Sequence, residues 1–453
     1  MVSSTVFLAA LAGAAGVHAH VGAGCGGHHV NKRNMGGPMK TYVPRAAPTD
    51  VASASQSLDP AEQCTAYSYQ PVLDVKNQFP AIWQTAGIVA GDTEAQSIFA
   101  TINATVNQKV PQISPKGTAN GDHTGVVYNN TDPDCWWTWR SCTTPSEDTG
   151  LPADITTVPE PQTWGLGFDD GPNCSHNALY DLLYENNQKA TMFYIGSNVI
   201  DWPLQAMRGL EDGHEICIHT WSHQYMTSFS NEVAFAELYY TRKIIKDILG
   251  VTPKCWRPPF GDVDNRIRVI AEGLNLTTIV WNEDSDDWRI GTNNVTAADI
   301  DANYERFIQQ AQNGTWATNG PVILNHELNN FTMSEMVKYY SQIKSAYKAV
   351  VPIQAAYNIT NPYVETNYTY PDFASYTSGS TNVSSTSASS SADTSASTQA
   401  SGRASAASAS GSGTKAAAAA AQSSKSATGP VRTVGGAVGI VAGLLGVGVL
   451  ATF

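Results

Sequence analysis

The stretch that most constrains this chain is Gly-Phe-Asp-Asp-Gly-Pro at residues 167–172. It follows an apolar run, residues 163–166, that is typical of a buried strand, and the Gly-Pro pair ends that strand abruptly. Two adjacent carboxylates at the end of a buried strand are costly unless another group compensates their charge. A metal ion is the usual compensation, whereas two solvated loop acids are the plainer interpretation. The partners of Asp169 and Asp170 decide between them.

From Thr163 onward, strand-like and helix-like runs alternate, which favours a parallel sheet. With about seven strands and short connections, we predict an α/β fold, a distorted or incomplete (β/α) barrel of the TIM type. In such folds the chemistry sits at the C-terminal ends of the strands. The predicted strands are residues 163–168, 190–195, 215–219, 254–257, 277–281 and 322–325. The predicted helices are 178–186, 204–211, 232–249, 264–272, 298–312 and 333–349.

The two ends of the chain are typical of export and anchoring. Residues 1–19 form an apolar stretch of small residues that ends in Val-His-Ala, which predicts a secretory signal peptide. Residues 434–453 form a second apolar run behind a cluster of small residues. That order predicts a signal at 429–453 that is removed and replaced by a glycolipid (GPI) anchor. The candidate attachment residues are Ser423, Ser424 and Ser426. An ordinary membrane-spanning helix is the alternative.

Composition divides the remaining chain. We expect residues 20–54 to be a disordered leader or propeptide, with a dibasic processing site at Lys32-Arg33. An irregular N-terminal arm, 55–158, is expected to pack on a catalytic domain at 159–360. Residues 371–428, rich in Ser and Thr, are expected to form a disordered stalk. The net charge of -13, with no basic run, argues against nucleic acid as a partner.

Glycosylation triplets and cysteines also suggest a secreted protein. Seven cysteines leave one unpaired in an oxidising compartment, and Cys25 in the leader is the expected odd one. Cys135 and Cys142, which flank a Trp-rich loop, form the easiest local pair, and the remaining connectivity stays open. The candidate N-glycosylation sites are Asn103, Asn129, Asn173, Asn275, Asn294, Asn313, Asn330, Asn358, Asn367 and Asn382.

Two stretches of the arm stand out. Residues 80–86 have a short helical pattern. Trp136, Trp137 and Trp139 concentrate three indoles in four residues. They could offer a platform on which sugars stack, but we favour packing of the arm on the main domain, since Trp is highly buried on average.

Potential ligands, acids and bases follow the other predicted strands. His219 and His223, at i and i+4, can bind one metal ion together with a carboxylate. Arg257 precedes two prolines, Asp287 lies in an acidic loop, and His326 ends the last strand. Each alone is more often structural. Five strand ends that all deliver such groups favour a catalytic site.

These segments resemble the motifs of the NodB-homology polysaccharide deacetylases, carbohydrate esterase family 4. They are residues 167–172, His-Thr-Trp-Ser-His at 219–223, Arg-Pro-Pro-Phe at 257–260, Asp-Ser-Asp-Asp-Trp at 284–288 and Leu-Asn-His at 324–326. Gly167 departs from the family's usual Thr, and Phe260 is within its range. The signal, stalk and anchor around this core are similar to those of fungal cell-wall chitin deacetylases.

The resemblance implies a divalent metal ion, zinc or cobalt and otherwise manganese, bound by Asp170, His219 and His223. Asp169, left off the metal, is then the general base that takes a proton from the attacking water. Arg257 tethers Asp169. A His₂Asp site suits several metals, so the sequence leaves the choice among them open.

The same resemblance implies roles for the other motif residues. His326 is the general acid that protonates the leaving amine, and Asp287 orients it. The backbone amide of Phe260 stabilises the oxyanion. Trp288 and Leu324 wall the pocket for the acetyl methyl group.

The expected activity is metal-dependent N-deacetylation of chitin, an N-acetylglucosamine polymer, to chitosan and acetate during cell-wall biogenesis. Two alternatives stay open: O-deacetylation of acetylated xylan, and an inert wall mannoprotein whose catalytic domain is a relic. We expect a secreted monomer whose partners are chitin or its oligomers, cell-wall polysaccharide and, through the anchor, the plasma membrane.

Overall fold

The computed structural model describes residues 47–385. The predicted signal peptide, dibasic site, anchor signal and its attachment residues, and most of the leader and stalk lie outside this range. Among residues 47–385 no helix has both the length and the apolar character needed to span a membrane.

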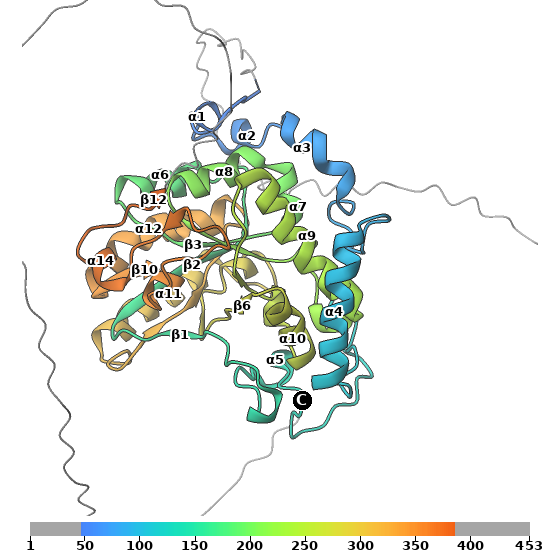
Figure 1. Cartoon of the computed structure of the whole chain (residues 1–453). Coiled ribbons are helices and arrows are strands. Elements are labelled where there is room, and N and C mark those ends of the chain that lie inside the picture. The colour runs from blue at the N-terminus through green and yellow to red at the C-terminus, as the bar shows by residue number, and fades with distance from the viewer. Residues whose placement is uncertain (1–46, 386–453) are drawn as a thin grey trace, which may run out of the picture. The chain divides into compact units, whose positions relative to one another are not determined.

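A curved parallel sheet forms the centre of the domain (Figure 1). Six strands are hydrogen-bonded in the order β10-β2-β3-β4-β5-β6, and every pair is parallel. This confirms the predicted α/β fold with a distorted, incomplete barrel. The strands are β2 (Thr163–Gly171), β3 (Thr191–Tyr194), β4 (Glu215–Ile218), β5 (Cys255–Trp256), β6 (Thr277–Thr278) and β10 (Ala349–Pro352).

Short pairings and single bridges connect further segments to β2. β7 (Glu283–Asp284) pairs in parallel with β9 (Ile323–Leu324). Parallel bridges then join Gly165 to Val322 and Asp169 to His326. The last bridge sets two of the predicted catalytic residues side by side. β1 (Thr157–Val158) pairs antiparallel with β8 (Gly320–Pro321).

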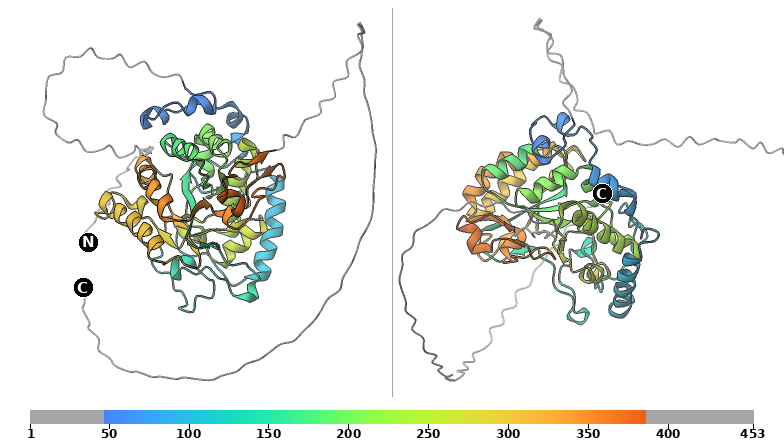
Figure 2. Two further views of the ribbon diagram at one scale, coloured as in Figure 1. Left: turned by 90° about the vertical axis from the view of Figure 1, so that its left-hand side faces the viewer. Right: turned by 45° about the horizontal axis from the view of Figure 1, so that its top comes forward.

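Helices cover the outside of the sheet (Figures 1 and 2). The predicted helices are all present, shifted at most by a few residues at their ends. They are α6 (Asn177–Glu185), α8 (Pro203–Glu211), α9 (Asn231–Leu249), α10 (Asn265–Gly273), α11 (Ala297–Gln312) and α12 (Asn330–Ala346). Two helices were not predicted: α7 (Gly196–Asp201), which follows β3, and α13 (Ile353–Ala356). The strand β10 was not predicted either, and the last predicted helix, 333–349, includes Ala349, which starts β10.

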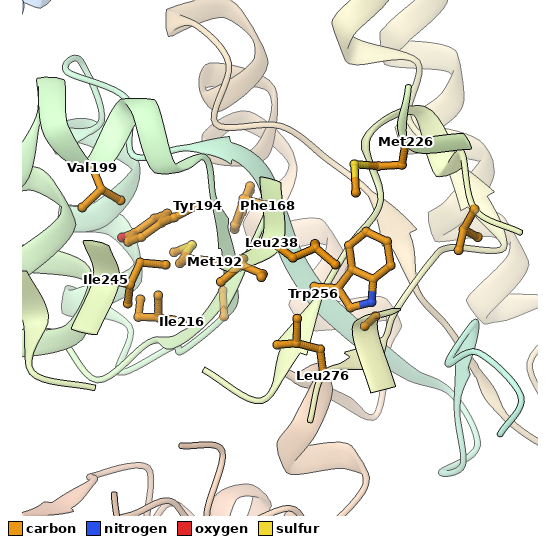
Figure 3. Packing of buried hydrophobic residues seen from close by; sticks show 14 of the residues in the cluster. Phe168, Met192, Tyr194, Val199, Ile216, Met226, Leu238, Ile245, Trp256 and Leu276 are labelled. Atoms are coloured by element: carbon orange, nitrogen blue, oxygen red, sulfur yellow. The ribbon is translucent and has the colours of Figure 1, made fainter. Parts of the chain in front are cut away.

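The core lies between the sheet and these helices. Figure 3 shows Phe168 of β2, Met192 of β3 and Ile216 of β4 beside Leu238 and Ile245 of α9. All five are fully buried, because alternate strand residues point outward to the helical layer.

The opposite strand face fills the barrel interior. Phe193 and Ile353 belong to this smaller apolar cluster. A Cβ at Gly167 would lie 3.2 Å from side-chain atoms of both. The space that a Thr would take at this motif position is therefore already filled.

The N-terminal arm lies at the periphery of the domain in both views of Figure 2 (blue). Its longest element, α4, packs against α9 and α10. Only short helical patterns were predicted here, and the one at 80–86 is wrong, since residues 82–83 form a turn and none of residues 80–86 is helical. The arm helices are α1 (Val51–Ala54), α2 (Pro60–Gln63), α3 (Gln70–Val75), α4 (Thr93–Lys109) and α5 (Trp137–Arg140).

Two predicted boundaries shift. Residues 51–54 of the expected disordered leader form α1, whose start is capped by the side chain of Asp50. The first part of the expected stalk also belongs to the domain: α14 (Phe373–Thr377) buries Tyr376, and β11 (Tyr368–Thr369) pairs with β12 (Ser384–Ser385).

Three disulfides join six of the seven cysteines. The local pair Cys135–Cys142 is confirmed. Cys64 of the arm pairs with Cys174, just after β2, and Cys217 of β4 pairs with Cys255 of β5. Cys25, the expected odd cysteine, lies outside the described residues.

Candidate active site

A cleft of ≈ 630 Å³ opens at the C-terminal ends of the strands. Eight of the ten residues with predicted catalytic, metal or substrate roles line it, and Arg257 and Asp287 lie fully buried behind it. The eight are Asp169, Asp170, His219, His223, Phe260, Trp288, Leu324 and His326. Residues far apart in sequence meet here because parallel strands bring their C-terminal ends to one edge of the sheet.

Asp170, His219 and His223 form a group that could hold a metal ion. One ligand atom from each lies within 4.8 Å of the others, and within residues 47–385 no other such cluster of three occurs. The Nε2 atoms of His223 and His219 lie 3.1 Å and 3.5 Å from Asp170 Oδ1. One carboxylate and two imidazoles form a donor set suited to Zn²⁺ and similar ions, with positions left open for reactants.

The carboxylate of this group fits a cation. Asp170 Oδ1 is buried and has no hydrogen-bond partner, since neither imidazole contact has hydrogen-bond geometry. Such an atom is costly to bury without compensation. Burial raises the pKa of Asp170, but the adjacent His223 and His219 outweigh it and hold that pKa well below its usual value. The carboxylate is therefore ionised and ready to bind.

The imidazole of His219 is aimed by a second contact. Its Nδ1 lies 2.8 Å from the backbone oxygen of Arg257. Because a carbonyl only accepts, Nδ1 carries the proton and Nε2 keeps a lone pair facing Asp170.

The backbone at this end of the strands adopts uncommon conformations. Asp170, Thr220 and His223 have φ angles of 70°, 63° and 53°. Non-glycine residues with positive φ are rare and persist where the surrounding structure imposes them. The positive φ of Asp170 lets its side chain point in a different direction from that of Asp169.

Asp169 is held away from the group of three by Arg257. Arg257 Nη1 lies 2.6 Å from Asp169 Oδ1, and both side chains are almost completely buried. The other guanidinium nitrogens donate to the backbone oxygens of Ile279 and Val280. Asp169 Oδ2 lies 3.7 Å from His219 Nε2, so the second carboxylate oxygen remains at the edge of the group of three.

His326 and Asp287 form a second hydrogen-bonded pair of ionisable side chains at this site. His326 Nδ1 lies 2.5 Å from Asp287 Oδ1, and the backbone N–H of His326 donates to Asp287 Oδ2. Burial lowers the pKa of His326, but Asp287 outweighs it, and the pKa of His326 is raised to about 10. The ring is therefore protonated at neutral pH.

Aromatic and aliphatic side chains wall the cleft. Leu324 is buried, whereas Trp288 and Phe260 are 45% and 42% exposed at its rim. The ring of Phe260 stacks on Tyr225 and lies beside His223.

Some residues that line the cleft lie outside the five motifs. Trp83 and Trp137 reach it from the arm, and Asn198 of α7 donates to the backbone oxygen of Asp170. Of the three clustered indoles, Trp136 is buried as packing predicted, but Trp137 lines the cleft. The indole cluster was the available signal for Trp137, whereas no pattern marks Trp83.

The loop that carries the two histidines is fixed by a buried glutamate. Glu237 of α9 accepts hydrogen bonds from the backbone N–H groups of Trp221 and Ser222 and from the hydroxyl of Ser222. It also accepts from Ala86 N of the arm. The arm therefore docks on the loop between His219 and His223.

None of the ten candidate glycosylation sites is buried, and seven are exposed. Asn173 is the unusual one, because it lines the cleft and its Nδ2 donates to the backbone oxygen of Leu328. Use of any of these sites stays a prediction.

Comparisons with known proteins agree with this geometry. Residues 156–279 match the model of the family described as polysaccharide deacetylase. Chitin deacetylase 2 of Cryptococcus neoformans var. grubii is 63% identical over 389 residues, which cover 85% of this chain and 84% of that protein. Chitin deacetylase of Amylomyces rouxii is 45% identical over 334 residues, 73% of this chain and 78% of that protein.

Among solved structures, the chitin deacetylase from the fungal pathogen Colletotrichum lindemuthianum matches 44% of this chain and 90% of that one. The identity is 24% and the TM-score 0.40. The extent of the sequence matches, together with the five strand-end motifs in one cleft, identifies the chain as a member of the polysaccharide deacetylase family.

Proposed function

We propose that this protein is a metal-dependent N-deacetylase that hydrolyses the acetamide groups of chitin to give chitosan and acetate in a fungal cell wall. The observation that carries the proposal is the arrangement in one cleft of a possible metal site, a carboxylate tethered off it, and a protonated imidazole opposite. The names of the extensively matched relatives support chitin as the substrate.

Asp170, His219 and His223 would hold the divalent cation, zinc or cobalt and otherwise manganese. A bound cation of this kind lowers the pKa of water and polarises a carbonyl oxygen. Asp169, oriented by Arg257, takes a proton from the water that attacks the acetamide carbon. The backbone amide of Phe260 would donate to the oxygen that gains negative charge.

The leaving group determines the need for His326. When the C–N bond breaks, the sugar nitrogen must gain a proton, because an amide anion is a very poor leaving group. His326 is protonated through its contact with Asp287 and lies next to Asp169 across the strand bridge. It donates that proton to nitrogen. Trp288 and Leu324 would enclose the acetyl methyl group.

The two alternatives gain no support from these observations. A relic would be expected to have lost a ligand or an acid, and all of these groups are present here: Asp169, Asp170, His219, His223, Asp287 and His326. The names of the extensively matched relatives point to chitin and not to xylan.

The test compares acetate release from chitin oligomers with release from acetylated xylan. Asp169→Asn and His326→Ala should each abolish release from chitin while the protein keeps its unfolding temperature. Undiminished activity in either variant would refute the assignment. Faster release from xylan than from chitin would favour the O-deacetylase.

Secretion, the membrane anchor, contact with cell-wall polysaccharide and a monomeric state remain part of the proposal. Secretion and the anchor rest on the terminal sequences, which lie outside the described residues.

A further inference from the structure

Trp83 brings an exposed indole from the N-terminal arm into the cleft. Its side chain is 43% exposed, and it lines the same cleft as Asp169 and His219. Trp83 lies outside residues 156–279, to which the family model matches. Trp83 is therefore an addition to the cleft that the five motifs do not account for.

The position of this indole is fixed. Its Nε1 donates to Asp201 Oδ2 at 2.8 Å, and its backbone N–H donates to Ser197 Oγ at 2.9 Å. Both acceptors belong to α7. Ser197 in turn donates to the backbone oxygen of Trp221, in the loop between the two histidines of the metal group. These bonds hold the edge of the indole and its backbone, so its position is tied to the metal group.

The backbone of Trp83 is also strained, with a φ of 58°. A bulky residue in this conformation is an outlier, and it persists only where surrounding contacts impose it. A surface tryptophan without such contacts would adopt a common backbone conformation with negative φ. The contacts therefore keep an apolar surface in place beside the active site although water covers much of it.

The topology places Trp83 and Trp288 on opposite sides of β2. Trp83 is bonded to α7, which follows β3, a direct neighbour of β2. Trp288 follows β7, which pairs with β9, and the strand segment of β9 is bridged to the other side of β2. A linear polymer that crosses the carboxylates of β2 from Trp288 would thus extend toward Trp83.

The rim of the cleft has the character of a sugar-binding surface. Of twelve large apolar side chains exposed within residues 47–385, four line this cleft: Trp83, Phe260, Trp288 and Leu328. The faces of a β-linked pyranose carry C–H groups that pack on an aromatic plane. A rigid indole supplies such a plane with little loss of conformational entropy.

We propose that Trp83 forms a subsite that stacks on a pyranose ring of the substrate chain other than the one that loses its acetyl group. The inference rests on the proposed function for its choice of polymer. It makes the arm a determinant of substrate length: oligomers long enough to reach Trp83 gain binding, and short ones do not.

The test compares Trp83→Leu and Trp83→Phe in acetate release from a chitin dimer and a chitin pentamer. Leu keeps apolar bulk but has no flat face, whereas Phe keeps one. Trp83→Leu should lower kcat/KM for the pentamer about five- to tenfold through KM, as expected for loss of an aromatic contact. It should change the dimer less than about twofold, and Trp83→Phe should retain most of the pentamer activity.

Trp139→Ala is the matched control, because Trp139 is on the same arm, is 42% exposed and does not line the cleft. It should behave as the unmodified protein on both oligomers. An equal loss on dimer and pentamer, or equal behaviour of the Leu and Phe variants, would overturn the subsite.

Binding of cellopentaose separates this inference from the proposed function. This oligomer has the β-linked pyranose backbone without acetyl groups, so its affinity is measured without turnover. Weaker binding by Trp83→Leu but not by Trp83→Phe supports the subsite even if the protein released no acetate from chitin. Unchanged binding by Trp83→Leu overturns it even if the protein is an active deacetylase.

Discussion

Arg257 Nη1 lies 2.6 Å from Asp169 Oδ1, with the arginine side chain fully buried. This contact divides the work of two adjacent carboxylates. Asp169 is held by the guanidinium of the residue that directly follows β5, while Asp170 turns to the imidazoles of His219 and His223. One carboxylate can therefore act on water while its neighbour binds a cation.

Replacing Arg257 with Lys should lower kcat about a hundredfold, the scale of a mispositioned general base. An ammonium cannot contact Asp169 and the backbone oxygens of Ile279 and Val280 together, as the guanidinium does. Metal content should stay at the level of the unmodified protein, because the substitution leaves the His219 ring bond to the backbone of residue 257 in place.

The control is Arg268→Lys. Arg268 is a second buried arginine with a carboxylate partner, Asp154, and it lies outside the cleft. The Arg268→Lys variant should have a lower free energy of unfolding and an unchanged kcat. A full kcat in Arg257→Lys would show that Asp169 does not need its tether.

Asp287→Asn should shift the basic limb of the pH–rate profile to lower pH. Asp287 raises the pKa of His326, and the acid form of His326 is the active one, so activity falls as pH rises through that pKa. Without the negative charge of Asp287 the pKa of His326 drops, and activity is lost at a pH lower by about one unit or more. In the loaded protein the cation repels the imidazolium, so the limb of the unmodified protein should lie below pH 10.

The measurement is kcat/KM across pH for both proteins with a chitin oligomer. A basic limb that stays in place in Asp287→Asn would exclude His326 as its source.

Glu237→Gln should weaken metal binding about ten- to a hundredfold, the usual range for supporting residues around a metal. Its carboxylate accepts from Trp221 N, Ser222 N and Ala86 N, whereas an amide presents N–H groups to some of these donors. The loop between His219 and His223 would then lose its fixed position.

Glu215→Gln gives the matched comparison. Glu215 is equally buried and accepts from the backbone N–H groups of Gln354 and Ala355, at the start of β4 rather than beyond its end. Both variants should unfold at lower temperature, but only Glu237→Gln should lose metal affinity in a competition assay with a chelating dye. Equal affinity in the two variants would contradict the role assigned to Glu237.

The sequence predicted the fold and the placement of the motif residues well, for a physical reason. Polar groups that end apolar strand runs must meet where a parallel sheet exposes its strand ends, so Asp169-Asp170, His219 and His223 could be placed together without coordinates. The choice of Asp170 as the metal ligand came from the family resemblance. The short strands did not weaken this prediction, because the motif residues mark their ends.

Other features depend on contacts that no local pattern encodes. Trp83 is positioned by Ser197 and Asp201, more than a hundred residues away in sequence. The strand β10 was not predicted, and its first residue, Ala349, was assigned to the end of a helix, since four apolar residues have no period of their own. Glu237 of α9 joins the arm to the histidine loop by accepting hydrogen bonds from backbone N–H groups of both, and such bonds leave no repeat in the sequence.

The most direct test of the central claim is acetate release from chitin oligomers before and after chelation, with zinc, cobalt and manganese added back singly. The account predicts that chelation abolishes release, that at least one ion restores it, and that Asp170→Asn binds that ion poorly and stays inactive. Full acetate release from the chelated protein, or restoration of Asp170→Asn to the unmodified rate, would contradict a catalytic metal at Asp170, His219 and His223.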